Sequence, residues 1–388
     1  MNRKLTITLV FLSVAFISGA VYFLYLFEQK NGEVLGSKNF APLELYAKSL
    51  KELDSSDLPD YNKVAADLKE ALKLVPPDTD LEGEIKIQLA QVLFQNQPSQ
   101  AINIFKEVWL NKYYSTNARG HALWLLANHL LANYNENILK QFFTDQNFAN
   151  LLKNNNFYIG IANIYALTAD VRSDVRANYA AAELYTEELL SDNNLSGDEK
   201  LSFADIIHSN LKKGDRLLGD SSSFSDLGPY FGSVEEQREG EAYGWRAKAL
   251  ANSYLLNPDL VTKEDVSANF EKAIMVLKGP KSLITKAAEI ETRFAYAHWL
   301  YEAYGDSHAS QIRTILDPLY ESKNKLAFGQ LKRFFSIEAS FSHSNHYHRR
   351  GIVILTKIDP RLKTTALETG WTEDSLNMPL TQLNTYPL

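Results

Sequence analysis

The sequence of 388 residues contains no cysteine. Disulfide bonds, cysteine nucleophiles and cysteine-based metal sites are therefore excluded. A basic excess is also missing, because 40 lysines and arginines stand against 47 aspartates and glutamates, giving a formal net charge of −7. Nucleic-acid binding requires concentrated Lys and Arg to meet the phosphates. The composition therefore argues against a nucleic-acid partner.

Short motifs typical of common enzymes are also missing. The chain has no G-x-x-x-x-G-K-[ST], G-x-G-x-x-G, H-E-x-x-H or G-x-S-x-G sequence. These patterns mark phosphate loops, dinucleotide sites, zinc proteases and serine hydrolases. Their absence lowers the expectation of catalysis, and the sequence predicts no catalytic residue and no cofactor.

A long run without charged residues is present near the N-terminus, from Leu5 to Phe27, and Arg3 and Lys4 precede it. A helix of that length covers roughly 35 Å, enough to cross a hydrocarbon core of about 30 Å. Residues 5–27 are therefore predicted to form a single transmembrane helix. Basic residues favour the cytoplasmic side, so residues 1–4 are predicted to be cytoplasmic and the body extracytoplasmic.

This N-terminal run has a second interpretation as a removable signal peptide. The small residues Ser18, Gly19 and Ala20 resemble a cleavage site that would release the chain after Ala20. The apolar sequence continues from Val21 to Phe27, which is unlike a mature N-terminus. An uncleaved anchor is therefore preferred, and a buried core helix is disfavoured by the length of the run.

The body has apolar residues at helical spacing, while sustained alternation with a period of two is rare. We predict a linker over 28–41, helical arrays over 42–218 and 235–360, a Gly/Ser-rich loop over 219–234, and a polar tail over 361–388 that is weakly ordered after Trp371. Short connections favour antiparallel helix pairs, and thus an all-α solenoid. Helices are predicted at about 42–53, 60–75, 81–95, 98–111, 116–133, 136–144, 147–167, 174–191, 197–218, 235–256, 263–277, 284–304, 308–321, 326–342 and 346–358.

Some of these segments resemble tetratricopeptide repeats, in which a small residue lets paired helices approach and a large residue fills the next groove. The resemblance implies a curved stack of helix pairs that serves as a binding scaffold. An irregular helical array with the same packing is the alternative. The matching pieces are Leu123-x2-Leu126-Ala127-x2-Leu130, Tyr158-x2-Ile161-Ala162-x2-Tyr165, Ala101-x3-Phe105 and Ala181-x3-Tyr185.

A histidine cluster is the most conspicuous polar feature of the sequence. His343, His346 and His348 could supply imidazole ligands to zinc. The adjacent Arg349 and Arg350 disfavour a cation, so these histidines are weak metal candidates in a turn that is predicted to be solvated. The remaining histidines are interpreted as structural: His121, His129, His208, His298 and His308.

Acidic residues are frequent, including Glu183, Glu187 and Glu241, but their abundance alone does not define a site. The alternating charges from Asp170 to Arg176 are interpreted as exposed ion pairs of small effect. The leading functional prediction is a non-catalytic, membrane-anchored scaffold for other proteins or peptides. The alternatives are an extracytoplasmic peptide- or glycan-binding protein and an envelope glycan hydrolase.

Overall fold

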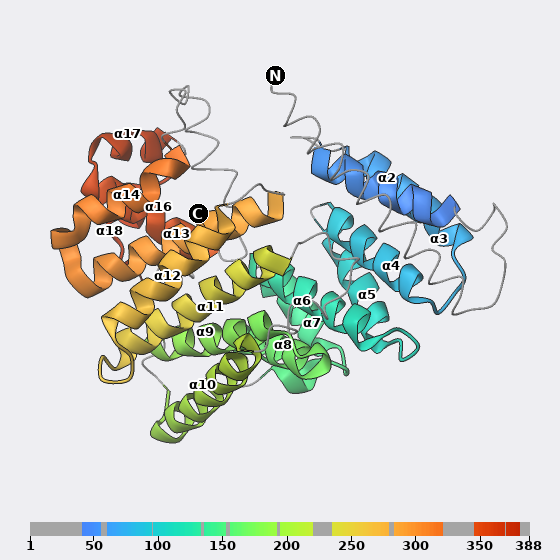
Figure 1. Ribbon diagram of the computed structural model, residues 1–388, viewed down its shortest axis with the longest axis horizontal. Coiled ribbons are helices and arrows are strands. Elements are labelled where there is room, and N and C mark those ends of the chain that lie inside the picture. Colours follow the sequence, from blue (N-terminus) through green and yellow to red (C-terminus); the bar gives the residue numbers. More distant parts are fainter. Residues whose placement is uncertain are drawn as a thin grey trace. The chain divides into compact units, whose positions relative to one another are not determined.

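The computed structural model describes residues 41–55, 60–94, 96–132, 136–152, 156–191, 195–219, 235–278, 283–320, 345–368 and 370–380. Regular structure within these ranges is helical, with no β-strand, as the apolar spacing predicts (Figure 1). The chain divides into two compact units, residues 1–77 and residues 78–388.

The first unit contains α2 (Ala41–Ser55) and α3 (Tyr61–Leu74), which pack against each other. Helix α3 begins where the Asp60 carboxylate accepts hydrogen bonds from the backbone N–H groups of residues 62 and 63, both at 3.1 Å. Val64, Leu68 and Ala71 follow at helical spacing and are buried. A capping carboxylate and an apolar stripe thus define this helix.

The second unit holds the remaining helices. They are α4 (Asp80–Leu93), α5 (Pro98–Leu110), α6 (Thr116–Ala132), α7 (Glu136–Thr144), α8 (Phe157–Arg172), α9 (Val175–Ser191), α10 (Gly197–Leu218), α11 (Glu235–Leu256), α12 (Lys263–Leu277), α13 (Leu283–Tyr304), α14 (Ala309–Tyr320), α16 (Asn345–Ile358), α17 (Arg361–Glu368) and α18 (Glu373–Asn377), with 3-10 turns at Ala149–Leu151 and Gly305–His308.

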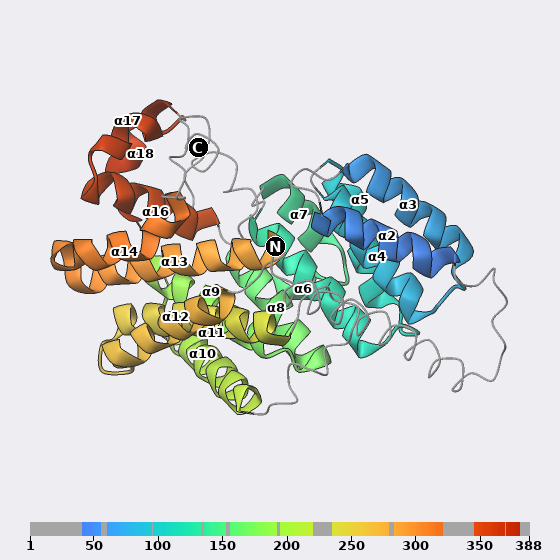
Figure 2. The same ribbon diagram turned by 45° about the horizontal axis from the view of Figure 1, so that its top comes forward.

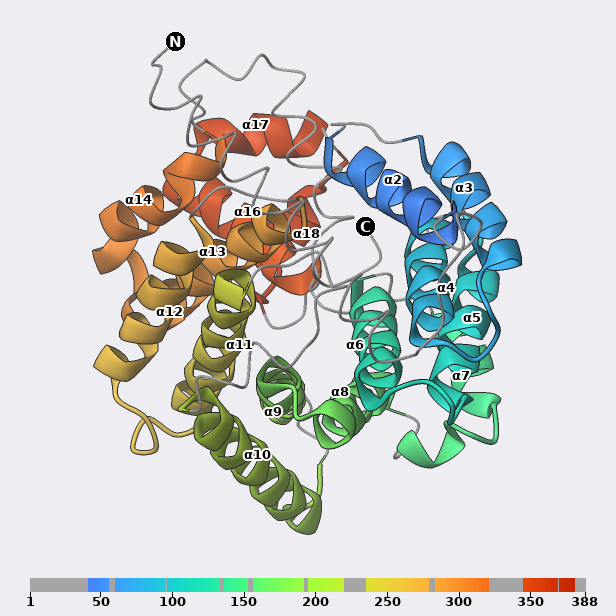
Figure 3. The ribbon, with the colours of Figure 1, turned by 45° about the vertical axis from the view of Figure 1, so that its right-hand side comes forward.

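Seven helices of this unit form a central row, in which each helix packs on the next: α4, α6, α8, α9, α11, α13 and α16. Other helices flank the row. Helix α5 packs on α4 and α6, α10 on α9, α12 on α11 and α13, and α14 on α13. Figures 2 and 3 show α12 beside α11 and α14 beside α13. The arrangement is solenoid-like, since neighbours in sequence are neighbours in space.

Two breaks in the chain differ from the predicted helix boundaries for local reasons. A single helix is predicted over 147–167, but α8 starts at Phe157 because the Asn156 side chain accepts a hydrogen bond from the Ile159 N–H at 3.1 Å. Ser173 then adopts a left-handed conformation, with φ of 55°, and ends α8 before α9 begins. This left-handed residue separates two helices by a very short turn.

The predicted polar tail over 361–388 differs from the structure through residue 380. Helices α17 and α18 occupy much of 361–377, and Trp371, Leu376 and Leu380 are buried in the core formed with α13 and α16. These apolar residues gain more from burial than from exposure, so the segment folds back. Residues 381–388, the loop residues 220–234 and the predicted helix over 326–342 lie outside the described ranges.

The predicted transmembrane helix requires correction. None of the helices in the described ranges is long and apolar enough to cross a membrane, and residues 5–27 themselves lie outside those ranges. The prediction rested on the length of the uncharged run and on the basic residues that precede it. The anchor is therefore withdrawn. The cytoplasmic N-terminus and the extracytoplasmic body are withdrawn with it, because both were inferred from the anchor.

Candidate functional site

Ionisable side chains gather in the interior of the central row. We call this set the interior network. It has an arginine cluster at one end, a glutamate cluster at the other, and aromatic rings between them. All its charged members are less than 9% exposed. The arginine cluster comprises Arg172, Asp174, Arg176, Arg238 and Glu241, and the glutamate cluster comprises Glu183, Glu187, Lys248, Asn252, Glu291, Tyr347 and Arg350.

Asp174 is the centre of the arginine cluster because the left-handed Ser173 places it between two arginines. Its Oδ2 accepts from Arg172 Nε at 3.0 Å, and its Oδ1 accepts from Arg176 Nε at 3.1 Å. The same carboxylate accepts from the Arg176 backbone N–H at 3.0 Å, which satisfies a free donor in the first turn of α9. Arg176 Nη1 continues to Glu241 Oε2 on α11 at 2.6 Å.

The charged groups of this cluster shift one another's pKa values. Burial alone would raise the pKa of Asp174, but Arg176 and Arg172 hold it well below its ordinary value. Arg238 lies near the same two arginines, and burial together with their charge lowers its pKa to about 10. Asp174 is therefore ionised at neutral pH and compensates neighbouring guanidinium groups.

Aromatic rings connect the two clusters. The Arg176 guanidinium carbon lies 4.5 Å from the centroid of Trp124, and the Trp124 and Trp245 rings meet edge to face with centroids 6.5 Å apart. Lys248 Nζ lies 3.2 Å from the Trp245 centroid. The Tyr165 hydroxyl, beside both indoles, donates to Asn128 Oδ1 at 2.5 Å. Cations stacked on rings favour a fixed arrangement of helices α6, α9 and α11.

The glutamate cluster joins α9, α11, α13 and α16. Lys248 pairs with Glu291, and Tyr347 Oη donates to Glu183 Oε1 at 2.8 Å. Arg350 pairs with Glu187. A cavity of about 10 Å³ is lined by residues including Trp245, Lys248 and Glu291. This space holds about one water molecule, so it is too small for a substrate.

Next to the arginine cluster, Glu84 of α4 meets His121 of α6, with Nδ1 to Oε2 at 3.5 Å. Burial raises the pKa of Glu84 to about 8, although Arg172 opposes the shift. Burial, followed by Arg172 and Arg176, lowers the pKa of His121 well below its usual value. The pair therefore prefers its uncharged form when folded. Gly120 leaves room for Arg172 here, because a Cβ would lie 2.6 Å from Arg172 Cδ.

We expect the stability of the protein to decrease as the pH rises through the pKa of Glu84. The ordinary pKa of a glutamate is 4.5 and the pKa of Glu84 in the folded protein is about 8. The stabilisation is therefore fully present below pH 4.5 and is lost as the pH rises to about 8. Urea unfolding of the wild type should show a loss of about 1 kcal/mol between pH 7 and 9 relative to Glu84→Gln. His121 has the opposite sign, but its contribution changes only at lower pH.

An exposed residue supplies the control for this pH effect. Glu136 on α7 has a side chain that is 61% exposed, so Glu136→Gln should keep the pH dependence of the wild type. If Glu84→Gln and the wild type lose stability in parallel from pH 7 to 9, Glu84 does not titrate in this range and the assignment is wrong.

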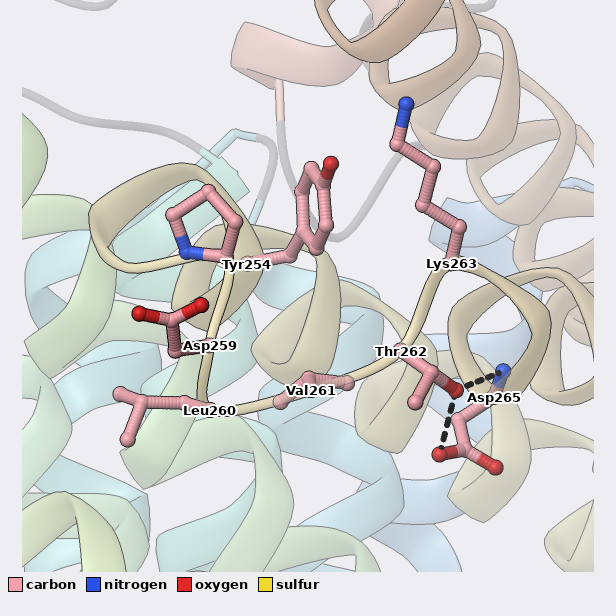
Figure 4. A pocket seen from close by; sticks show the side chains of 8 residues that line it. Tyr254, Asp259, Leu260, Val261, Thr262, Lys263 and Asp265 are labelled. Carbon is pink, nitrogen blue, oxygen red and sulfur yellow. Dashed lines mark hydrogen bonds between the residues drawn. The ribbon is translucent and has the colours of Figure 1, made fainter.

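A second feature is an open pocket at the turn between α11 and α12, with a volume of about 250 Å³ (Figure 4). Figure 4 shows Tyr254 and Lys263 extending in the same direction, while Leu260 lies on the other side of the pocket. Lys263 Nζ donates to the Ala303 carbonyl at 3.2 Å and lies 4.0 Å from the Tyr304 centroid. We call this the turn pocket. Its Leu260 is 68% exposed.

Of the three histidines named as weak metal candidates, His343 lies outside the described ranges. His346 and His348 lie at the start of α16. The described residues contain no group of three or more His, Asp or Glu side chains placed to hold a metal ion.

Five other histidines were interpreted as structural. His121 and His129 both lie on α6, whereas His208 lies on α10, His298 on α13 and His308 in the 3-10 turn at Gly305–His308. The His129 ring stacks on Phe94 with centroids 4.3 Å apart, and His308 stacks on Tyr304 at 3.9 Å. His298 is buried near Tyr347. His208 is exposed on α10. His121 lies beside Glu84, next to the arginine cluster.

The interpretation of the segment 170–176 as exposed ion pairs was wrong for three of its residues. Asp170 is exposed and pairs with Lys213 at 3.1 Å. Arg172, Asp174 and Arg176 are buried. The alternating charges are typical of a solvated turn, and only the apolar residues on both sides of the segment indicated burial.

The glutamates on α9 were not predicted as part of a site, because their partners lie far away in the sequence.

The small and large residues of the predicted repeat pieces are buried, including Phe105, Ala162 and Tyr165. Burial fits both a tetratricopeptide repeat and an irregular helical array, so the repeat assignment stays a prediction. Comparison of the chain with protein-family models, with curated proteins and with solved structures gave no match.

Proposed function

We propose that the chain is a non-catalytic helical scaffold that binds another protein or a peptide. One observation carries this proposal: the buried charges of the central row pair from helix to helix. Arg176 on α9 reaches α11, and Lys248 on α11 reaches α13. Such pairs fix neighbouring helices at one spacing. A platform of fixed geometry loses little entropy on binding, which is what a scaffold requires.

The same pairs argue for a structural use of the network rather than a chemical one. A hydrolase needs an acid and a base beside a space that admits substrate. The cavity at Lys248 and Glu291 measures about 10 Å³, and these two side chains form an ion pair with each other. The interior network therefore supports a scaffold better than the envelope hydrolase considered from the sequence.

The turn pocket is the accessible surface that we assign to the partner. It combines the Tyr254 ring, the Lys263 ammonium group and the exposed Leu260 around a volume of about 250 Å³. Amphipathic rings and aliphatic groups beside a charge are typical of protein interfaces. An apolar side chain of a partner would enter this pocket.

Replacing Leu260 by aspartate tests the surface, because a carboxylate in an apolar contact must lose its hydration. We expect Leu260→Asp to reduce at least tenfold the cross-linked yield of a specific protein neighbour in the native host, measured by quantitative mass spectrometry. Leu201→Asp is the matched control. Leu201 on α10 is also 68% exposed, and its substitution should leave the yield unchanged.

Two results would contradict the proposed function. The first is that no protein neighbour responds to Leu260→Asp while both variants fold as the wild type does. The second is hydrolysis of a glycan by the purified chain that is lost with Glu291→Gln. The first result removes the turn pocket as a binding surface, and the second removes the non-catalytic assignment.

A further inference from the structure

The turn pocket carries hydrogen-bond donors that the described residues leave without an acceptor. Lys263 Nζ donates to the Ala303 carbonyl at 3.2 Å and forms no other hydrogen bond or ion pair within those residues. An ammonium group has three donors, so two of them remain. The Tyr254 hydroxyl also has no hydrogen-bond partner in the part of the chain that the structure describes. Together these groups can bind an acceptor that a partner supplies.

Aromatic packing holds both donor side chains in place. The Tyr254 ring meets the buried Trp299 ring edge to face, with centroids 6.3 Å apart. The Lys263 ammonium group lies 4.0 Å from the Tyr304 centroid and 5.6 Å from the Tyr254 centroid. A cation that already rests on two rings is positioned before a ligand arrives. The donors therefore lose little conformational entropy when they bind an acceptor.

The acidic residues of the pocket lie away from these donors. Figure 4 shows the side chains of Lys263 and Tyr254 extending toward one end of the pocket. Asp259 and Asp265 lie toward the other end in the same view, and Asp265 Oδ2 accepts a hydrogen bond from the Thr262 hydroxyl at 2.7 Å. A carboxylate from a partner would be repelled by these aspartates and attracted by the ammonium group. The pocket therefore has one place for a negative charge.

Apolar groups line the space next to this place. Leu260 is 68% exposed, and Val261 and Tyr254 are partly buried against the core. An apolar side chain of a partner would release water from these groups. Of the described residues that line the pocket, Lys263 alone is basic. A single ammonium group without an arginine suits a singly charged carboxylate better than a doubly charged phosphate.

We infer that the turn pocket recognises two neighbouring residues of the partner, one acidic and one apolar. The carboxylate binds Lys263 Nζ and the Tyr254 hydroxyl, and the apolar side chain contacts Leu260. This inference rests on the proposed function, because it names the chemistry of the partner that the scaffold binds. Either order of the two residues places a carboxylate beside an apolar side chain, so both orders serve as probes.

The test is a double-mutant cycle between the full chain and short peptides. The probes are Gly-Glu-Leu-Gly and Gly-Leu-Glu-Gly, acetylated and amidated at their ends, and the same peptides with Gln in place of Glu. Calorimetry should show that this replacement weakens binding of at least one order to the wild type tenfold or more. It should weaken binding to Lys263→Gln less than twofold, because the cation is already missing. Tyr254→Phe should give an intermediate effect.

Lys272 supplies the matched control. It lies on the same helix as Lys263, its side chain is 41% exposed, and it does not line the pocket. Lys272→Gln should therefore keep the preference of the wild type for the Glu peptide. Circular dichroism should show that Lys263→Gln is as helical as the wild type.

Equal binding of the Glu and Gln peptides to the wild type would overturn the inference, as would a preference that survives Lys263→Gln. Absence of binding for both orders at millimolar concentration would overturn it as well. If Lys263→Gln does not fold, Tyr254→Phe replaces it, and an undiminished preference in that variant is equally contrary. Equal binding of both peptides that is lost with Leu260→Asp leaves the proposed function in place. An unchanged cross-linked yield with Leu260→Asp removes the proposed function, so the two failures are distinguishable.

Discussion

Replacing Arg176 by alanine is expected to lower the free energy of unfolding by about 3–5 kcal/mol, the usual cost of breaking a buried ion pair. Arg176 compensates both Asp174 and Glu241, at distances of 3.0 and 2.6 Å. Its removal leaves two buried carboxylates with less compensation and also removes the cation from the face of Trp124. Urea unfolding followed by circular dichroism would measure the loss.

An exposed ion pair supplies the control for Arg176. Lys213 pairs with Asp170 at 3.1 Å, but the two side chains are 49% and 63% exposed. Lys213→Ala should change stability by less than about 1 kcal/mol, because water screens the pair. Arg176→Lys should lie between these results. If Arg176→Ala costs no more than Lys213→Ala, the arginine cluster does not stabilise the fold.

Replacing Gly351 by alanine should lower the free energy of unfolding by about 3 kcal/mol, the upper end of the range for overpacked cores. A Cβ at this position would lie 1.8 Å from Phe294 Cδ1, far inside van der Waals contact. Phe294 is fully buried in the core between α13 and α16, so it has little freedom to move. The better helix propensity of alanine, worth about 1 kcal/mol, is insufficient compensation.

Gly197 offers a matched control for Gly351. It is the first residue of α10, and a Cβ there meets nothing within 4 Å. Thermal unfolding of both variants would measure the effects, and Gly197→Ala should be neutral or slightly stabilising. An unchanged midpoint for Gly351→Ala would mean that α13 and α16 are not packed as closely as the structure has them.

The helices could be predicted from the sequence because the apolar spacing and the capping residues that define them are local. The apolar spacing around Leu123 and Tyr165 identifies buried faces, and Ser196 with Glu199 forms the capping box that starts α10. The interior network was not accessible, because its contacts are remote in sequence. Tyr347 and Glu183 are 164 residues apart, and no local sequence pattern around either residue predicts the contact between them.

The charge pattern was the least reliable predictor of burial. It indicated that Arg172 and Asp174 are exposed to solvent, but both are buried because the left-handed turn at Ser173 directs this charged segment into the interior. The backbone conformation of a single serine decides this outcome, and serine is not a residue that signals φ above zero. The turn pocket was missed for a different reason, since Tyr254 and Lys263 belong to separate helices that meet only after α12 folds back.

The buried pair of Arg350 and Glu187 also changes how the second unit should come apart. A row in which each helix touches only its neighbours melts stepwise from its ends, as a one-dimensional array does. Arg350 and Glu187 connect two helices that are not adjacent in that row, since α11 and α13 lie between α9 and α16. The contact closes a ring of four helices, so fraying at the α16 end must first break a buried ion pair. Cooperativity in residues 175–358 would then come from ring closure rather than from repeat stacking alone.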